Sequence, residues 1–441
     1  MALFSAQALQ PGVRKREVLG WAMYDFANSG YTTVVLTAVF NAYFVGVVVG
    51  DRPWATLAWT LTLASASLLV MLTIPALGAW ADRHGAKKRV LAVSTVGCVL
   101  TTAALSWAGP GDLAWAVVAL VLSNMFFGWG ESMTAAFLPE LARRDSLGKV
   151  SGWGWSFGYF GGMLSLGLCL AHVLSAKAAG QSAEQFVPVT LWITAGIFAL
   201  ASLPTFLLLR ERALPQQRHA DHLRPAGAWQ QLRASWQAAQ HHLDFRWLLA
   251  CGVAYQAGIA VVIALAAVYA EQVLGFAQAD TMMLVFLVNI ASALGAFAWG
   301  HVQDRIGHRP ALALTLWGWL VMILLAAMAT TRPVFWAAAV VAGLCMGASQ
   351  SAGRALAGLL SPPDRLAEFY GLWTFAVRLS SIVGPITYGL VTWLSDGNHR
   401  LAILCTGLFF AAGLWLLRRV DVGRGAAAAG LAPQTATNSA A

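Results

Sequence analysis

The chain alternates between long apolar stretches and short polar connections, at a spacing that predicts membrane-spanning helices. An apolar helix of about 20 residues, rising 1.5 Å per residue, crosses the roughly 30 Å hydrocarbon core of a bilayer. Twelve such stretches are expected, near residues 18–49, 56–80, 90–108, 113–137, 151–174, 188–209, 246–270, 280–301, 311–329, 333–357, 368–394 and 399–417. The pattern predicts an all-α membrane protein with twelve transmembrane helices in two sets of six.

Polar segments divide these helices into two halves. The predicted organisation is an N-terminal tail (1–17), a first six-helix bundle (18–209), a linker (210–245), a second six-helix bundle (246–417) and a disordered tail (418–441). Within the linker, Trp229, Leu232 and Trp236 recur at helical spacing, which predicts an amphipathic helix over about 226–242 at the membrane surface. The tail is rich in Ala, Gly, Ser and Thr, a composition typical of disorder.

Composition supports the membrane assignment and argues against several other classes. The chain is 59% hydrophobic and 11% charged, whereas soluble domains carry about 25% charged residues. The net charge of +9 is spread over many connections, so we expect no nucleic-acid partner. No connection is long enough for a catalytic domain, and no nucleophile with a base or metal-ligand spacing is recognised. We therefore expect no enzyme, no metal and no cofactor.

Lysine and arginine are distributed unequally between the two sets of connections. Of the 28 basic residues, 22 fall on the side that carries both termini and four fall on the opposite side. The other two, Arg354 and Arg378, lie within predicted helices. Since positive charge is retained on the cytoplasmic side during insertion, both termini are predicted to be cytoplasmic. With short loops and no recognisable organellar targeting peptide, a bacterial inner membrane is the expected location.

A polar motif occurs twice, at equivalent positions of the two halves. The pattern GxxxDRxG follows the second and eighth predicted helices at an offset of 222 residues, and its repeated positions are Gly78, Asp82, Arg83 and Gly85, and Gly300, Asp304, Arg305 and Gly307. Glycine permits tight turns, and an aspartate can sit against a helix N-terminus or basic side chains. The repeat predicts a duplicated six-helix unit. Its aspartates act either as gate latches, with Arg143 or Arg144 as possible partners of Asp82, or as static braces.

Together, the twelve-helix pattern and the paired motifs resemble the major facilitator superfamily of secondary transporters. Three further stretches resemble its vacuole-effluxer or "unknown major facilitator" family, which is related to autophagy-associated amino-acid effluxers of fungal vacuoles. These stretches are Trp21 to Ser29, Leu138-Pro139-Glu140 followed by Ser151 to Gly162, and Ala367 to Leu372. The resemblance covers about residues 17–420 and implies two pseudo-symmetric bundles that rock about a central site. It also implies a monomer.

The resemblance implies that the first, fourth, seventh and tenth helices line a cavity, and each of these carries a polar stripe. The expected residues of the translocation cavity are Tyr24, Asp25, Asn28, Asn124, Glu131, Trp155, Tyr255, Gln256, Gln350, Arg354 and Arg378. A charge inside the hydrocarbon costs at least about 2.5–3.5 kcal/mol, so embedded charges usually face water or a partner. Two acids in the first half and two arginines in the second can therefore link the bundles. Static ion pairs, and simple packing for Trp155, are the alternative interpretations.

These features favour a secondary transporter that moves a small polar solute by alternating access. An amino acid is the first substrate expected, from the family resemblance. Protons are a possible coupling ion, with Asp25 or Glu131 as the coupling acid. The alternative is a sensor or scaffold in the membrane that has the same fold and transports nothing.

Overall fold

The computed structural model describes residues 5–50, 52–213, 228–276 and 278–430. Within these ranges the chain is helical apart from its connections and an isolated antiparallel bridge between Leu9 and Ala142. Twelve of the described helices are long and apolar enough to cross a membrane. The predicted all-α membrane protein with twelve spanning helices is confirmed.

The helices form two six-membered groups along the chain. In the first half, the spans are α1 (Lys15–Gly30), continuing through η2 (Tyr31–Ala38), α2 (Phe40–Tyr43) and η3 (Phe44–Val48), then α3 (Ala55–His84), α4 (Lys87–Ala104), α5 (Leu113–Ala136), α7 (Leu147–Ala178) and α8 (Ala183–Leu208). In the second half they are α10 (Leu243–Leu274), α11 (Gln278–Ile306), α12 (His308–Met328), α13 (Arg332–Leu359), α14 (Leu366–Leu394) and α15 (His399–Leu417). Shorter helices are α6 (Leu138–Leu141), α9 (Ala228–Ala239) and α16 (Val422–Ala428).

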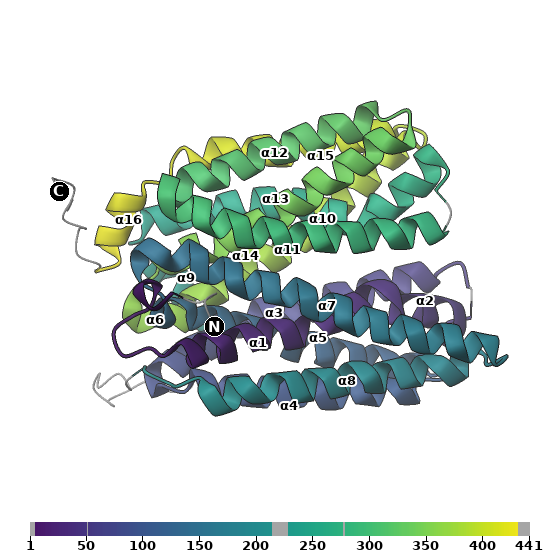
Figure 1. The fold of residues 1–441 in the computed structure, drawn as a ribbon, viewed down its shortest axis with the longest axis horizontal. Helices are drawn as coiled ribbons and strands as arrows, with labels where there is room; N and C mark the ends of the chain where they lie inside the picture. The colour runs from purple at the N-terminus through teal and green to yellow at the C-terminus, as the bar shows by residue number, and fades with distance from the viewer. Residues whose placement is uncertain (1–4, 51, 214–227, 277, 431–441) are drawn as a thin grey trace.

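The two groups lie side by side with their helices nearly parallel to one long axis (Figure 1). Helices of the first half, in purple to teal, form one bundle, and those of the second half, in green to yellow, form the other. The start of α1 lies toward one end of the molecule, together with α6, α9 and α16. The connections rich in lysine and arginine lie at this end, which we call the basic end.

The first span departs from regular α-helix in a stretch rich in Thr and Val. Residues Tyr31–Ala38 form wider π-helical turns. The Thr33 hydroxyl donates to the Ser29 carbonyl at 2.9 Å, and the Thr37 hydroxyl donates to the Thr32 carbonyl at 2.9 Å. These bonds from side-chain hydroxyls to backbone carbonyls compete with the hydrogen bonds of a regular α-helix. The β-branched Thr and Val side chains also have few rotamers in a helix, so the irregular turns have a local cause.

The linker contains a helix where the sequence predicts one, since α9 lies within the expected range of 226–242. In α9, the side chains of Trp229 and Trp236 are exposed whereas Ser235 is buried, and contact of the apolar stripe with the membrane surface stays a prediction. Residues 214–227 of the linker lie outside the described residues.

The tail expected to be disordered instead begins with α16. Asp421 caps this helix at the Arg424 backbone amide, and the Arg424 side chain pairs with Asp244 at 2.6 Å. A cap and an ion pair to the start of α10 offset the low apolar content of the segment. Residues 431–441 of the tail lie outside the described residues.

Glycines bring the bundles into backbone contact at two equivalent places. A Cβ atom on Gly78 of α3 would lie against the Ala367 carbonyl at the start of α14, and one on Gly300 of α11 would lie 2.6 Å from the Gly148 carbonyl of α7. Both separations are shorter than van der Waals contact allows. The crossings α3 with α14 and α7 with α11 therefore require glycine.

We predict that Gly78→Ala and Gly300→Ala each destabilise the protein by about 1–3 kcal/mol, because the added methyl group must displace backbone. Gly167→Ala is the matched control, since a Cβ there meets nothing within 4 Å and alanine favours the helix. Thermal unfolding in detergent measures the effect. Equal midpoints for Gly78→Ala and Gly167→Ala would contradict the prediction.

Candidate functional site

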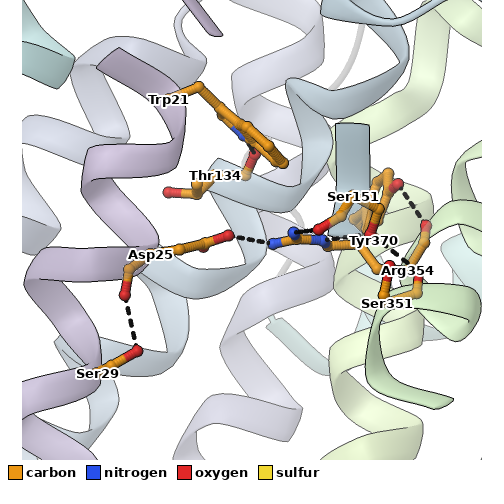
Figure 2. A network of polar contacts seen from close by, with 8 residues as sticks. All are labelled: Trp21, Asp25, Ser29, Thr134, Ser151, Ser351, Arg354 and Tyr370. Atoms are coloured by element: carbon orange, nitrogen blue, oxygen red, sulfur yellow. Dashed lines mark hydrogen bonds and ion pairs between the residues drawn. The ribbon is translucent and has the colours of Figure 1, made fainter. Parts of the chain in front are cut away.

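A buried ion pair joins the two bundles. Asp25 on α1 accepts a hydrogen bond from Arg354 Nη1 on α13 at 2.7 Å (Figure 2). The two side chains are only 14% and 7% exposed. The cost of removing these charges from water is offset because each neutralises the other and because the other two guanidinium nitrogens also donate hydrogen bonds.

Each of the three guanidinium nitrogens of Arg354 donates a hydrogen bond. Its Nε donates to the Ser151 hydroxyl at 3.1 Å and its Nη2 donates to the Ser151 carbonyl at 2.7 Å. Ser151 in turn donates to the Ser351 carbonyl, and Tyr370 donates to the Arg354 carbonyl at 2.8 Å. The network therefore connects α1, α7, α13 and α14 in one cluster, which Figure 2 shows.

Aromatic rings enclose the same guanidinium. Arg354 lies 4.8 Å from the ring centroid of Trp21 and 5.4 Å from that of Trp155. Trp21 is held in place because its Nε1 donates to the Thr134 carbonyl at 2.8 Å. Cation–π contacts of a desolvated arginine strengthen the ion pair and exclude water from it. Trp155 thus contacts a charged residue as well as packing against Tyr159.

The repeated aspartates bind helix N-termini of the opposite bundle. Asp82 at the end of α3 accepts from the backbone N–H groups of Ala367 and Glu368 on α14, at 3.1 and 2.9 Å. Asp304 near the end of α11 accepts from those of Gly148 and Lys149 on α7, both at 3.0 Å. In both cases the amides belong to the second and third helical residues, which have no acceptor within their own helix. We call these two contacts the latches.

Each latch combines a hydrogen-bonded cap with a favourable charge. A carboxylate at a helix N-terminus satisfies orphan amides and interacts with the positive end of the helix dipole. The partner of Asp82 is thus backbone rather than the Arg143 or Arg144 side chain considered from the sequence. Arg83 and Arg305 are exposed beside the latches.

The motif glycines shape the turns that follow the latch aspartates. Gly85 ends α3 in the left-handed region at φ +56°, and Gly307 precedes α12 at φ +93°. Side chains other than glycine rarely adopt these values, so the turns keep both aspartates at fixed distances from the next helix. Gly78 and Gly300 supply the close helix crossings described above.

The second embedded arginine, Arg378 on α14, is paired far less completely. Its Nη2 lies 3.4 Å from Glu131 Oε2 and its Nη1 lies 3.4 Å from Asn124 Oδ1. Its buried Nε has no acceptor among the described residues. The Glu131 side chain stays 42% exposed although it lies within a spanning helix. This long, open pair contrasts with the short, enclosed pair of Arg354 and Asp25.

The remaining predicted cavity residues are of two kinds, namely amide side chains and two tyrosines that pack inside their own bundles. Gln256 on α10 donates to Gln350 on α13 at 2.7 Å, while Asn28 is buried on α1 one turn from Asp25. Tyr24 and Tyr255 pack inside their own bundles, where Tyr24 accepts from Thr95 and Tyr255 lies against Gly353. We therefore leave both tyrosines out of the proposed cavity.

Three contributors to the basic end were not predicted as site residues. Ser151 holds Arg354, the Glu368 backbone holds Asp82, and buried Lys87 pairs with Glu140. The sequence offers one signal for Glu368 and Glu140, because each lies in a stretch that carries the family resemblance. Ser151 has no chemical signature of its own, since small polar residues are common in packed membrane helices.

We predict that Asp25→Asn destabilises the protein by about 3–5 kcal/mol, because it leaves the Arg354 charge buried without a counter-charge. The double variant Asp25→Asn/Arg354→Gln should recover part of this loss. Asp280→Asn is the matched control, since Asp280 and Arg332 form an exposed pair at 3.3 Å, which is worth at most about 1 kcal/mol. Thermal unfolding provides the measurement, and strictly additive losses in the double variant would refute the coupling.

The sequence is similar to a known protein family and to individual members of it. The model of the family described as "Vacuole effluxer Atg22 like" matches residues 44–430. The uncharacterized MFS-type transporter YxiO of Bacillus subtilis is 24% identical over 405 residues, which span 90% of this chain and 93% of that protein. Autophagy-related protein 22-1 of Aspergillus fumigatus is 28% identical over 300 residues, covering 63% of this chain and 48% of the fungal protein. The match thus spans about half the length of that fungal relative.

Solved structures share the fold. The human organic anion transporter MFSD10 superposes with a TM-score of 0.74 at 15% identity, covering 92% of this chain and 100% of that structure. The Escherichia coli fucose:proton symporter FucP gives a TM-score of 0.68 at 15% identity, covering 92% and 97%. The chain has the fold of the major facilitator superfamily and belongs to its Atg22-like vacuole effluxer family.

Proposed function

We propose that this protein is a secondary transporter that moves a small polar solute across the membrane by alternating access. The observation that carries the proposal is that reversible polar contacts join the bundles at the basic end, namely two latches and one enclosed ion pair. Each contact couples a carboxylate of one bundle to a donor of the other. Rocking of one bundle against the other separates all three, so they act as one gate.

The contacts described above correspond to a conformation with a closed basic end. When the gate opens, each latch carboxylate leaves its helix N-terminus and is hydrated by the water that enters. Hydration replaces the lost hydrogen bonds, so the free-energy difference between the closed and open states stays small. A solute that binds the two states with different affinity then shifts the equilibrium between them. Transport needs this balance, since a gate held too firmly would not cycle.

We propose that the basic end faces the cytoplasm, so that both termini are cytoplasmic. The excess of lysine and arginine in the connections of this end supports this orientation. A bacterial inner membrane is the proposed location, and the similarity to a Bacillus subtilis protein over nine-tenths of this chain supports it. We propose that the protein works as a monomer.

An amino acid is the proposed substrate, with Arg378, Glu131 and Asn124 as its contacts. The incompletely paired guanidinium of Arg378 suits a substrate carboxylate, and the half-exposed Glu131 suits an ammonium group or a transferable proton. Asn28, Gln256 and Gln350 provide neutral polar groups on α1, α10 and α13. In this proposal, the Asp25–Arg354 pair serves the gate rather than the substrate.

The latches give a first test of alternating access. We predict that Asp82→Asn or Asp304→Asn weakens closure by about 1–2 kcal/mol, which is roughly a tenfold change in the closed-to-open ratio, because an amide replaces a charged cap. Spin labels at exposed positions 89 and 418, one in each half at the basic end, report the separation. A longer distance should gain population in either variant.

Asp112→Asn is the control for the latch test, because this exposed aspartate bonds only to the Gly109 amide of its own turn. It should leave the distance distribution unchanged. Identical distributions for Asp82→Asn and Asp112→Asn would show that the latch does not stabilise closure.

Transport itself is tested with proteoliposomes and a pool of labelled amino acids, with and without an imposed proton gradient. We predict uptake by the intact protein, at least a tenfold loss in Arg378→Gln because the substrate carboxylate loses its partner, and loss of gradient dependence in Glu131→Gln. Arg332→Gln is the control, since this arginine is 54% exposed at the end of a connection.

Each outcome of the flux assay has a separate meaning. No uptake of any amino acid would refute the substrate proposal, and the same assay with sugars, peptides and organic anions would then test transport alone. Solutes that raise the unfolding temperature without crossing the membrane would favour a sensor and contradict transport. Equal uptake by Arg378→Gln and Arg332→Gln would exclude Arg378 from the substrate site.

A further inference from the structure

An apolar groove lies on the protein near the basic end. It has a volume of about 250 Å³ and runs between α9, α10 and α14. Its lining includes Trp236 of α9, Trp247 and Ala250 of α10, and Phe375 and Leu379 of α14. Trp236 and Leu243 are 43% and 47% exposed whereas Leu249 and Leu372 are buried, so the groove opens to the outside of the bundle.

The length of the groove matches one leaflet of a bilayer. Its lining on α10 extends over the eleven residues from Leu243 to Val253, whose first and last Cα atoms lie about 15 Å apart along a helix. Half of the hydrocarbon core is also about 15 Å. An extended acyl chain therefore fits along the groove, whereas a compact polar solute would leave apolar side chains exposed to water.

A single charged side chain marks the outer end of the groove. Arg246 is the one charged residue among the described lining residues, and it lies one turn from the start of α10. Its guanidinium has no acceptor in the part of the chain that the structure describes. The neighbouring acids are already occupied, since Asp244 pairs with Arg424 and Glu368 pairs with Arg365.

Two tryptophans lie beside this charge. Trp236 and Trp247 both line the groove near Arg246. Tryptophan favours the depth of the lipid headgroups, where its ring is apolar and its N–H can meet polar groups. The groove thus has a basic and aromatic outer end and an apolar inner part, which is the polarity of a phospholipid with an anionic headgroup.

We propose that this groove binds an anionic phospholipid, with the headgroup phosphate on Arg246 and one acyl chain along α10 and α14. In the orientation proposed above, the lipid comes from the cytoplasmic leaflet, which carries the anionic lipids. The bound lipid lies next to the latch region, because Ser235, the neighbour of Trp236, donates to the side chain of Glu368, whose backbone amide holds Asp82.

The test uses the full-length protein in a neutral detergent, with added dioleoylphosphatidylglycerol or dioleoylphosphatidylcholine. A ligand that binds the folded state raises the unfolding midpoint in proportion to its occupancy. We expect a rise of a few degrees with phosphatidylglycerol and a clearly smaller rise with phosphatidylcholine, whose chains are identical. Native mass spectrometry should show preferential retention of one phosphatidylglycerol.

Matched variants locate the site. Arg246→Gln should abolish the preference for phosphatidylglycerol, whereas Arg233→Gln, which removes an exposed charge of α9 outside the groove, should keep it. Ala250→Trp fills the groove and should reduce the response to both lipids. If this variant does not fold, the two arginine variants decide the result.

Three results would overturn the proposal. Equal shifts with both lipids would show that no headgroup is recognised. Equal losses in Arg246→Gln and Arg233→Gln would indicate general surface charge rather than this groove. An equal shift with glycerol phosphate, which has the same phosphate chemistry but no acyl chains, would identify a simple anion site. The outcome is independent of transport, because neither the assay nor the variants involve Arg378 or the latches.

Discussion

A charge buried inside a membrane protein needs a partner, and here the partner comes from the other half of the molecule. Asp25 is neutralised by Arg354 across the boundary between the bundles, and Arg354 in turn depends on Ser151. Neither bundle can satisfy its own charge in this region. The cost of an unpaired charge in a low-dielectric medium therefore favours the closed arrangement, and any opening must supply water or another ion in place of the partner.

The latches apply the same constraint to backbone groups. The first amides of a helix have no internal acceptor, and at the basic end of α7 and α14 the acceptor is an aspartate from the opposite bundle. Since Asp82 and Asp304 occupy equivalent positions of the repeat, the closed end has two contacts related by pseudo-symmetry. Two moderate contacts on either side of the Arg354 cluster resist rocking in both directions better than one strong contact would.

Much of the architecture could be predicted from the sequence, because its cause is local. Runs of about 20 apolar residues specify spanning helices wherever they occur, and the repeated GxxxDRxG motif marks the duplicated halves. The partners across the bundles were harder to predict. The acceptor of Asp82 is a pair of backbone amides, which no residue type identifies. Similarly, the sequence places Tyr24 next to the polar stripe that contains Asp25, but it could not show that Tyr24 turns toward Thr95 within its own bundle.

The two embedded arginines differ in how completely they are paired. Arg354 donates a hydrogen bond from each of its three nitrogens and contacts two aromatic rings, so it is enclosed and closely paired. Arg378 has two contacts of 3.4 Å, a buried Nε without an acceptor among the described residues, and a half-exposed acid as its counter-charge. A closely paired arginine loses hydrogen bonds when its partners are exchanged. An arginine with long contacts gains shorter hydrogen bonds from a new partner. If a solute anion takes the place of Glu131 on Arg378, the displaced carboxylate must find a cation or a proton. In the proposed function, binding of the solute and protonation of Glu131 would thus be linked through charge balance, without a direct contact between them.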